Sequence, residues 1–120
     1  MNTIAKGNIG EDKAGRYLEG IGFTVLFRKW RTKSGEIDII AQKEDVLVFA
    51  EVKRLPSGNA ETLGHELGRR KQGRIIETSK CFLSKYRQYN SAVVRYDVLV
   101  VDMPGYPDVY HIENAFWESV

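Results

Sequence analysis

Short apolar runs separated by polar, turn-like residues dominate the first half of the chain and return near its end. The runs 23–28, 36–42 and 46–52 are rich in β-branched and aromatic residues, which is typical of consecutive strands. Residues 93–102 form a longer run, and 108–112 a short one after a Pro/Gly turn. We therefore expect three strands, the last two joined as a hairpin, then a buried strand, a small C-terminal strand and a terminal turn of helix.

Two segments have helical spacing. Residues 8–21 place apolar residues on one face, with Asn8 as a candidate cap and Glu11 in the first turn. Residues 60–88 continue this pattern, although three glycines weaken its first half. The order is helix, three strands, helix, strand, and a crossover helix between strands requires a parallel pair. The pattern predicts one α/β domain over residues 1–120, with a mixed central sheet flanked by helices.

Ionisable residues interrupt the two strands of the expected hairpin: Glu36, Asp38, Glu51 and Lys53. Because side chains alternate along a strand, Glu36 and Asp38 lie on the same face of their strand, and Glu51 and Lys53 lie on the same face of theirs. A tight turn near Glu44 brings Asp38 and Glu51 to the same face, whereas a slip of one residue separates them. We expect three carboxylates and one lysine to converge at the end of the hairpin away from the turn.

Such a cluster favours metal chemistry. Buried carboxylates raise one another's pKa, and one lysine does not balance three of them. A divalent cation does, and oxygen-only ligands suit Mg²⁺ or Mn²⁺. A metal of this kind activates water and stabilises a phosphoryl oxyanion, which points to phosphodiester hydrolysis. The alternative is a set of cross-strand ion pairs on an exposed sheet end, and the spacing alone does not separate the two.

Further candidates come from the helices. Glu11 borders the apolar stripe of the first helix, where it can reach the sheet or act only as a first-turn acid. Lys71 and Gln72 stand one turn before the apolar pair Ile75 and Ile76. They can meet a phosphate or the attacking water over the sheet end, or serve as an ordinary helix start.

Charge is unevenly distributed along the chain. Residues 96–120 contain five acids and no Lys or Arg, so they carry −5. Because the whole chain carries +2, residues 1–95 carry +7. Clustered basic residues are the usual footprint of a polyanion partner, the alternative being two solvated basic surfaces. Trp30, between two of these residues, can stack on a base or belong to the core. The candidate phosphate contacts are Arg28, Lys29, Arg31, Arg69, Arg70, Lys71 and Arg74.

Several classes of protein are disfavoured. No apolar run approaches the roughly 20 residues that span a bilayer, and the N-terminal residues resemble no export or targeting signal, so we expect a cytoplasmic protein without membrane association. The lone Cys81 has no partner at metal-ligand spacing and falls in an apolar pattern, which predicts a partly buried, small core residue. His65 and His111 have no zinc spacing, so each is expected at the surface or satisfied by neighbours.

With these residues in place, the chain resembles the YraN-like family of small bacterial proteins, assigned to the PD-(D/E)xK restriction-endonuclease-like superfamily. In two places it departs from the family pattern: Lys29 stands where Asn is usual, and Arg54-Leu55 where a Thr-Arg pair commonly follows the lysine. The segments that carry the resemblance are 7-GNIGEDKAGRYLEGIGFTVL-26, 34-SGEIDII-40, 48-VFAEVK-53, 71-KQGRI-75, 95-RYDVLVV-101 and 111-HIENAF-116.

The resemblance implies a restriction-endonuclease-like core. It makes Asp38 and Glu51 metal-binding acids and Lys53 the catalytic lysine. Glu11 would complete the site, and Gln72 with Lys71 would face it. The leading hypothesis is a Mg²⁺- or Mn²⁺-dependent nuclease that hydrolyses DNA.

The competing hypothesis is a DNA-binding protein of the same fold that cuts little or nothing. Such a protein would act with a partner in repair, recombination or DNA uptake. A small domain of either kind gains reach as a homodimer.

Overall fold

The helices and strands follow the order that the apolar runs predict. The computed structural model describes residues 3–118, with side chains described from residue 9 onward. Within this range no helix is long and apolar enough to cross a membrane. The elements are α1 (Thr3–Gly20), β1 (Thr24–Thr32), β2 (Gly35–Lys43), β3 (Val46–Arg54), α2 (Ala60–Glu66), α3 (Arg69–Lys85), a 3₁₀ turn (Arg87–Tyr89), β4 (Val93–Val101) and β5 (Val109–Phe116).

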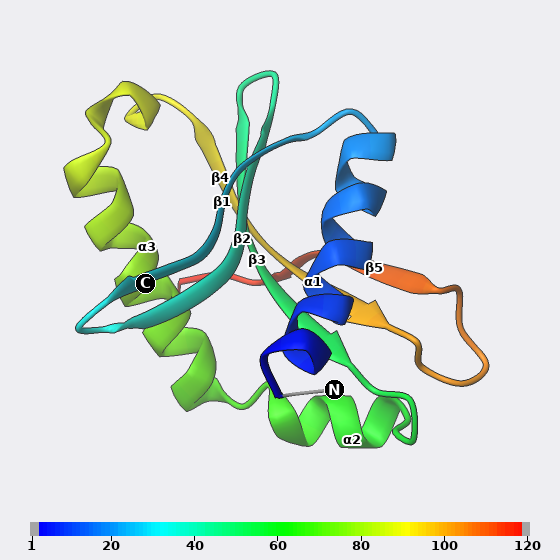
Figure 1. Cartoon of the computed structure of the whole chain (residues 1–120). Coiled ribbons are helices and arrows are strands. Elements are labelled where there is room, and N and C mark those ends of the chain that lie inside the picture. The colour runs from blue at the N-terminus through cyan, green and yellow to red at the C-terminus, as the bar shows by residue number, and fades with distance from the viewer. Residues whose placement is uncertain (1–2, 119–120) are drawn as a thin grey trace.

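The five strands form one mixed sheet in the order β1-β2-β3-β4-β5 (Figure 1). The pair β3–β4 is parallel, and the other neighbours are antiparallel. The chain crosses between the parallel strands through α2 and α3, as a parallel pair requires. The expected mixed sheet flanked by helices is confirmed.

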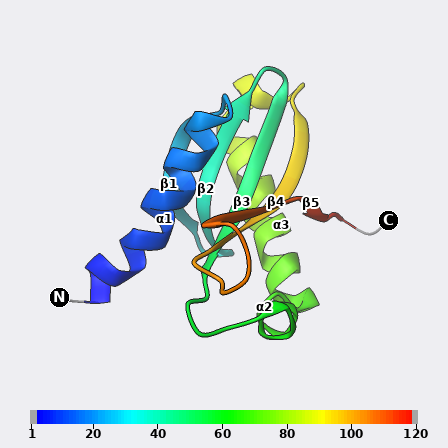
Figure 2. The ribbon, with the colours of Figure 1, turned by 90° about the vertical axis from the view of Figure 1, so that its right-hand side faces the viewer.

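The two long helices cover opposite faces of the sheet (Figures 1 and 2). On the α1 face, Ala14 and Leu18 pack against alternate residues of the central strands, among them Val48. On the α3 face, Phe82 is fully buried and meets the Phe49 ring edge-on. Each long helix therefore buries one apolar stripe, and the central strands are buried on both sides.

The hairpin of β2 and β3 has the register that the pattern predicts. Lys43 pairs with Val46, leaving Glu44 and Asp45 as a two-residue turn. Glu44 has φ of +55°, the positive value that such tight hairpin turns require. The length of this turn fixes which residues of β2 and β3 pair with each other.

Regular alternation along β2 would place Ile37 on the same face as Ile39, but the two lie on opposite faces. Ile37 packs in the cluster on the α3 face together with Ile40, whereas Ile39 belongs to the α1 face. The alternation breaks at Asp38, beside Lys29 of the neighbouring strand, whose φ is +53°. The irregular backbone frees Asp38 from the regular pleat and leaves apolar residues on both sides of it buried.

The helical segments differ from expectation at their ends. The α1 helix begins at Thr3, so Asn8 lies inside it rather than at its cap. The expected single helix over 60–88 is divided near Gly68, which caps α3, while the Asn59 side chain caps α2 by accepting from the Thr62 N–H at 2.9 Å. Glycine lowers the stability of a helix interior, which accounts for the division.

The C-terminal segment also differs. Instead of a terminal turn of helix, β5 runs on to Phe116, whose ring stacks on Tyr96 with centroids 5.3 Å apart. The Asn114 N–H donates to Asp97 at 2.9 Å across an irregular step in the β4–β5 pairing. These contacts hold the extended strand in place.

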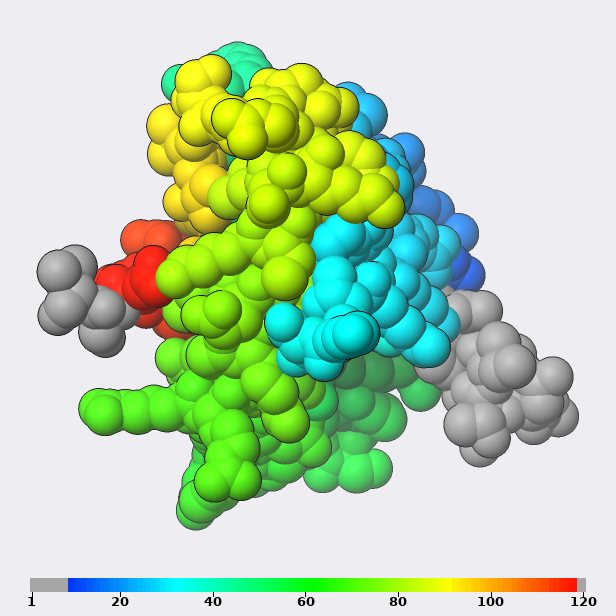
Figure 3. Space-filling model, turned by 90° about the vertical axis from the view of Figure 1, so that its left-hand side faces the viewer, coloured from blue at the N-terminus to red at the C-terminus, as the bar shows by residue number. Residues whose placement is uncertain are grey.

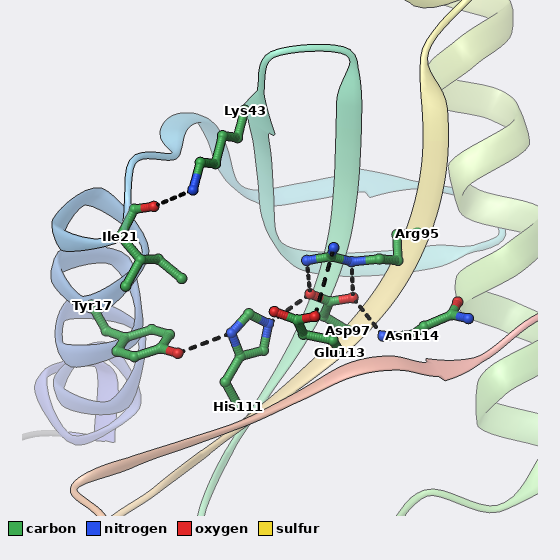
Figure 4. A network of polar contacts seen from close by, with 8 residues as sticks. All are labelled: Tyr17, Ile21, Lys43, Arg95, Asp97, His111, Glu113 and Asn114. Atoms are coloured by element: carbon green, nitrogen blue, oxygen red, sulfur yellow. Dashed lines mark hydrogen bonds and ion pairs between the residues drawn. The ribbon is translucent and has the colours of Figure 1, made fainter.

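A buried polar network ties α1 to β4 and β5 (Figure 4). Asp97 is fully buried and accepts two hydrogen bonds from Arg95, each at 2.9 Å. His111 lies between Asp97, at 2.6 Å, and the Tyr17 hydroxyl, at 3.0 Å. Although burial opposes ionisation of Asp97, its hydrogen bonds to His111 and Arg95 hold its pKa below the ordinary value.

The structure decides the predictions made for four side chains. His111 is satisfied by its neighbours, and His65 is exposed, so both histidine predictions are confirmed. Trp30 is partly buried and packs against the core, with its ring centroid 5.3 Å from that of Phe82. The expectation that Cys81 is a small core or partly buried residue is wrong, because its side chain is exposed, with Sγ 3.8 Å from the Ser34 hydroxyl.

Candidate functional site

Asp38 and Glu51 face each other where the hairpin opens. The backbone ladder between β2 and β3 ends at the pair Ile39 and Ala50, so Asp38 and Glu51 are the next two residues in register. Here the strands diverge (Figure 1), and the Asp38 carboxylate accepts a hydrogen bond of 2.8 Å from the backbone N–H of Val52. The predicted meeting of the two acids away from the turn is confirmed.

The Asp38 carboxyl group is largely withdrawn from water. Burial raises its pKa to about 7, and the neighbouring Glu51 carboxylate pushes it in the same direction. The hydrogen bond from Val52 opposes the rise because it favours the ionised form. Near neutral pH, the pair therefore holds a proton readily and gains from any cation placed beside it.

Glu11 is a third buried acid, on the opposite side of the sheet from α3. It lies well inside α1, so its alternative role as a first-turn acid is wrong. Burial raises its pKa, while Lys29, whose Nζ lies 3.7 Å from Glu11 Oε2, lowers it. The other oxygen, Oε1, is buried and has no hydrogen-bond partner among the described residues. The charge of Glu11 in turn raises the pKa of Asp38.

Two lysines lie against the carboxylate pair. The Nζ atom of Lys71, from the first turn of α3, lies 2.8 Å from Glu51 Oε1, and the Nζ atom of Lys53 lies 3.9 Å from the same oxygen. Lys53 also lies 3.5 Å from a Glu66 carboxylate oxygen, at the end of α2. The site is therefore a compact arrangement of alternating charges from β2, β3, α2 and α3.

A cavity of about 500 Å³ opens onto these acids. It lies between the β1–β2 turn and α3, which adjoin in Figure 3. Basic and acidic side chains both line it, so a charged ligand would meet partners of either sign. The lining residues are Lys33, Ser34, Gly35, Glu36, Asp38, Glu51, Lys71, Arg74 and Ile75.

Residues 10–101 match the model of the uncharacterised protein family UPF0102. The chain belongs to this family. It is 42% identical over 118 residues to a UPF0102 protein of Treponema pallidum, covering 95% of this chain and 94% of the relative. It is 39% identical to one from Sulfurihydrogenibium, covering 97% of each, and 37% identical to one from Frankia casuarinae, covering 93% and 96%. The expected membership of a family of small bacterial proteins is confirmed.

In this UPF0102 protein, Gln72 lies apart from the acids. Its side-chain amide donates to the Leu67 carbonyl at 2.7 Å, which links the start of α3 to the end of α2. It lines a different cavity, on the other side of α3. Of the two adjacent residues Lys71 and Gln72, the structure brings only the lysine to the site.

The candidate phosphate contacts fall into two groups. On β1, Arg28 lies 2.7 Å from Asp12, and Arg31 hydrogen-bonds to Glu36, while Lys29 lies near Glu11. On α3, by contrast, three arginines make no ion pair with any described residue. The second group, which remains available to an outside anion, consists of Arg69, Arg70 and Arg74.

The donor atoms of the site are carboxylate oxygens, the type of ligand that hard divalent cations bind. Among the described side chains, no three His, Cys, Asp or Glu residues are close enough to form a metal site by themselves. Asp38 and Glu51 nevertheless supply two adjacent carboxylates, and Mg²⁺ commonly takes one or two protein carboxylates with several waters. The raised pKa of Asp38 and the unpartnered oxygen of Glu11 both favour an added positive charge. The residues of this UPF0102 site therefore fit Mg²⁺ or Mn²⁺.

Glu66 is the charged neighbour that the sequence did not reveal. It reaches Lys53 because the chain bends between α2 and α3, which turns the end of α2 toward the sheet. Gly64 and Gly68 are signals for such a break. Neither indicates which acid then meets the lysine.

Proposed function

We propose that this protein is a divalent-metal-dependent nuclease that hydrolyses phosphodiester bonds of DNA. The observation that carries the proposal is the pair of half-buried Asp38 and buried Glu51, with lysines at 2.8 and 3.9 Å from one Glu51 oxygen. Such a pair is costly unless it binds a cation or proton. The unpaired arginines of α3 beside it supply charge complementary to a polyanion.

The proposal includes a restriction-endonuclease-like core. Its support is the element order of α1, three strands, a crossover helix and β4, with the parallel pair β3–β4 at the centre. In this core, Asp38 lies on the second strand and Glu51 on the third, and Lys53 follows Glu51 by two residues. The helix α2 and strand β5 are additions to this core.

In this proposal, Asp38 and Glu51 hold Mg²⁺ or Mn²⁺, which when bound would lower the pKa of water and stabilise charge on a phosphoryl oxygen. Lys53, 3.9 Å from Glu51, orients the attacking water and offsets developing negative charge. Glu11 accepts a hydrogen bond at its unpartnered oxygen from a group bound beside the pair. Arg74, on the rim of the cavity, contacts the phosphate.

The test is a cleavage assay with Mg²⁺ or Mn²⁺ on linear, branched and single-stranded DNA. Asp38→Ala and Lys53→Ala are expected to lower the rate at least about 100-fold, because general acid–base and electrostatic groups contribute on this scale. Glu19→Ala, which removes an exposed acid of α1, is the matched control and should keep the rate. Cleavage that survives both site substitutions overturns the proposal.

One observation favours a second candidate, a DNA-binding protein that does not cut. Lys71 already lies 2.8 Å from Glu51 and neutralises it without a metal. This candidate predicts salt-sensitive DNA binding with no cleavage on any of these substrates. Calorimetric titration with Mn²⁺ separates the two, since only the nuclease requires metal affinity that Asp38→Ala abolishes.

A further inference from the structure

The exposed face of α3 carries three arginines that make no ion pair with any residue whose side chain the structure describes. At 100° per residue, Arg69, Arg70 and Arg74 span about 140° of the helix surface. Arg74 borders the cavity of the acidic site, and Arg69 borders a groove on the other flank of the helix. The unpaired charges therefore form a path across α3 from the groove to the site.

The groove has a volume of about 360 Å³ and lies between α3 and the C-terminal segment of the chain (Figure 3). Trp117 forms one wall, and 67% of its surface is exposed. Gly73 and Ile76 of α3 line the groove with little bulk, and Arg69 and Gln72 provide polar groups. The groove thus offers a flat aromatic face beside an unpaired guanidinium.

Two acids also line this groove, and they share one lysine. Glu118 pairs with Lys80, whose Nζ atom also lies 3.7 Å from a Glu77 carboxylate oxygen. Arg69 has no such partner among the described residues. Two acids against one lysine leave a negative charge at one end of the groove, and the unpaired positive charge of Arg69 lies at the other end, nearer the start of α3.

Trp117 is more exposed than the other tryptophan of the chain. Trp30 is partly buried and packs edge-on against Phe82 of the core, so one edge of its ring is already in contact with protein. An exposed indole gains free energy by stacking on any base, since every base has a π face, and stacking next to a cationic groove is typical of single-strand binding. A base paired within a duplex is already stacked on its neighbours and cannot insert in this way.

We propose that Trp117 and the groove bind an unpaired nucleobase. In this arrangement Arg69, Arg70 and Arg74 bind the phosphates that lead from that base across α3 to the Asp38 and Glu51 site. The inference rests on the proposed function and narrows its substrate to DNA with a single-stranded segment beside the cleaved bond.

The test is DNA binding without metal, measured by fluorescence anisotropy in EDTA. The probes are a single strand of about ten nucleotides, within the range that single-strand-binding domains cover, and a blunt hairpin duplex. Trp117→Ala is expected to weaken single-strand binding about 5- to 100-fold, as removal of a stacking aromatic does. It should leave duplex binding unchanged. Trp117→Phe, which keeps an aromatic face, should retain most of the affinity.

Tyr106→Ala is the matched control. Tyr106 is also an exposed aromatic, but it lies in the turn between β4 and β5, away from α3 (Figure 1). Equal effects of the Trp117 and Tyr106 substitutions, or equal losses on both probes, overturn the proposal. So does a Trp117→Ala protein that binds DNA normally but loses a dimer in sedimentation, since the groove then serves a second copy.

Failure of this inference and failure of the proposed function are separable. An absence of cleavage with intact, Trp117-dependent single-strand binding rejects only the nuclease. Metal-dependent cleavage that Trp117→Ala leaves unchanged on single-stranded and duplex DNA rejects only the groove.

Discussion

At the scale of single residues, Asp38 explains why charged side chains stand in apolar strands. It lies where the hairpin ladder has ended, so its carboxylate rather than a backbone carbonyl receives the Val52 N–H. The same position places it beside Glu51 and away from water, which raises its pKa to about 7. The Asp38 carboxylate thus supplies the acceptor for a strand N–H, and its burial disfavours its own ionised form.

The raised pKa of Asp38 predicts a pH-dependent cost to stability. The folded protein binds this proton more tightly than the unfolded chain, whose Asp pKa is about 4, so stability falls as pH rises from about 4 to about 7. Asp38→Asn mimics the neutral acid and keeps an acceptor for Val52. It is expected to stabilise the protein by about 1–3 kcal/mol at pH 8 and by nearly nothing at pH 4.

Urea unfolding at the two pH values measures this difference. Glu19→Gln neutralises an exposed acid of α1 and should change stability little at either pH. A gain from Asp38→Asn that is equal at pH 4 and pH 8 contradicts the assignment of the raised pKa to Asp38.

At the scale of elements, the two-residue turn between β2 and β3 controls the site. A shift of one residue would send Asp38 and Glu51 to opposite faces. The turn places Glu44 at φ of +55°, a conformation that costs a side-chain-bearing residue free energy and glycine none. The hairpin therefore keeps its register although its turn residue is not the preferred one.

Replacing Glu44 by glycine should relieve this strain. The expected gain in the free energy of unfolding is about 0.5–1 kcal/mol, the strain relieved less the greater freedom of glycine in the unfolded chain. Urea unfolding measures it. Asp45→Gly, at the next position and without a positive φ, is the matched control and should not stabilise. A loss of stability from Glu44→Gly would show that the turn is not strained.

At the scale of the whole molecule, the basic residues separate by whether the fold neutralises them. Those of β1 lie next to acids of α1 and β2, including Asp12 and Glu36. The three arginines of α3 are exposed and have no ion pair in the described part of the chain, unlike Lys71 and Lys80 of the same helix. The net charge of the sequence hides this difference, because it counts both groups alike.

This division predicts which arginines set the salt dependence of DNA binding. Each phosphate contact contributes about 0.7–0.9 to the slope of log K against log salt. Replacing Arg69, Arg70 and Arg74 together by Gln should lower the slope by about 2–3. Replacing Arg28 and Arg31 by Gln should lower it by less than about 1, because their charges are already paired.

Binding titrations over a series of potassium chloride concentrations give both slopes. Equal reductions from the two sets of substitutions would show that the β1 arginines exchange their internal partners for phosphates.

The sequence by itself determined the order of the elements, the mixed sheet and the meeting of Asp38 with Glu51. These depend on periodicity and turn length, which act over a few residues and are readable without neighbours. It also singled out Lys53 and Lys71 but could not separate Lys71 from Gln72 as the one that reaches Glu51.

The tertiary structure decided the rest. The packing of α2, α3 and β5 against strands distant in the chain determines four features. These are the break of alternation at Asp38, the reach of Glu66 to Lys53, the contact of Trp30 with Phe82 and the exposure of Trp117. Local patterns carry no record of such contacts, because the same residue types at the same spacing fit either a buried or an exposed position until the packing of the helices selects one.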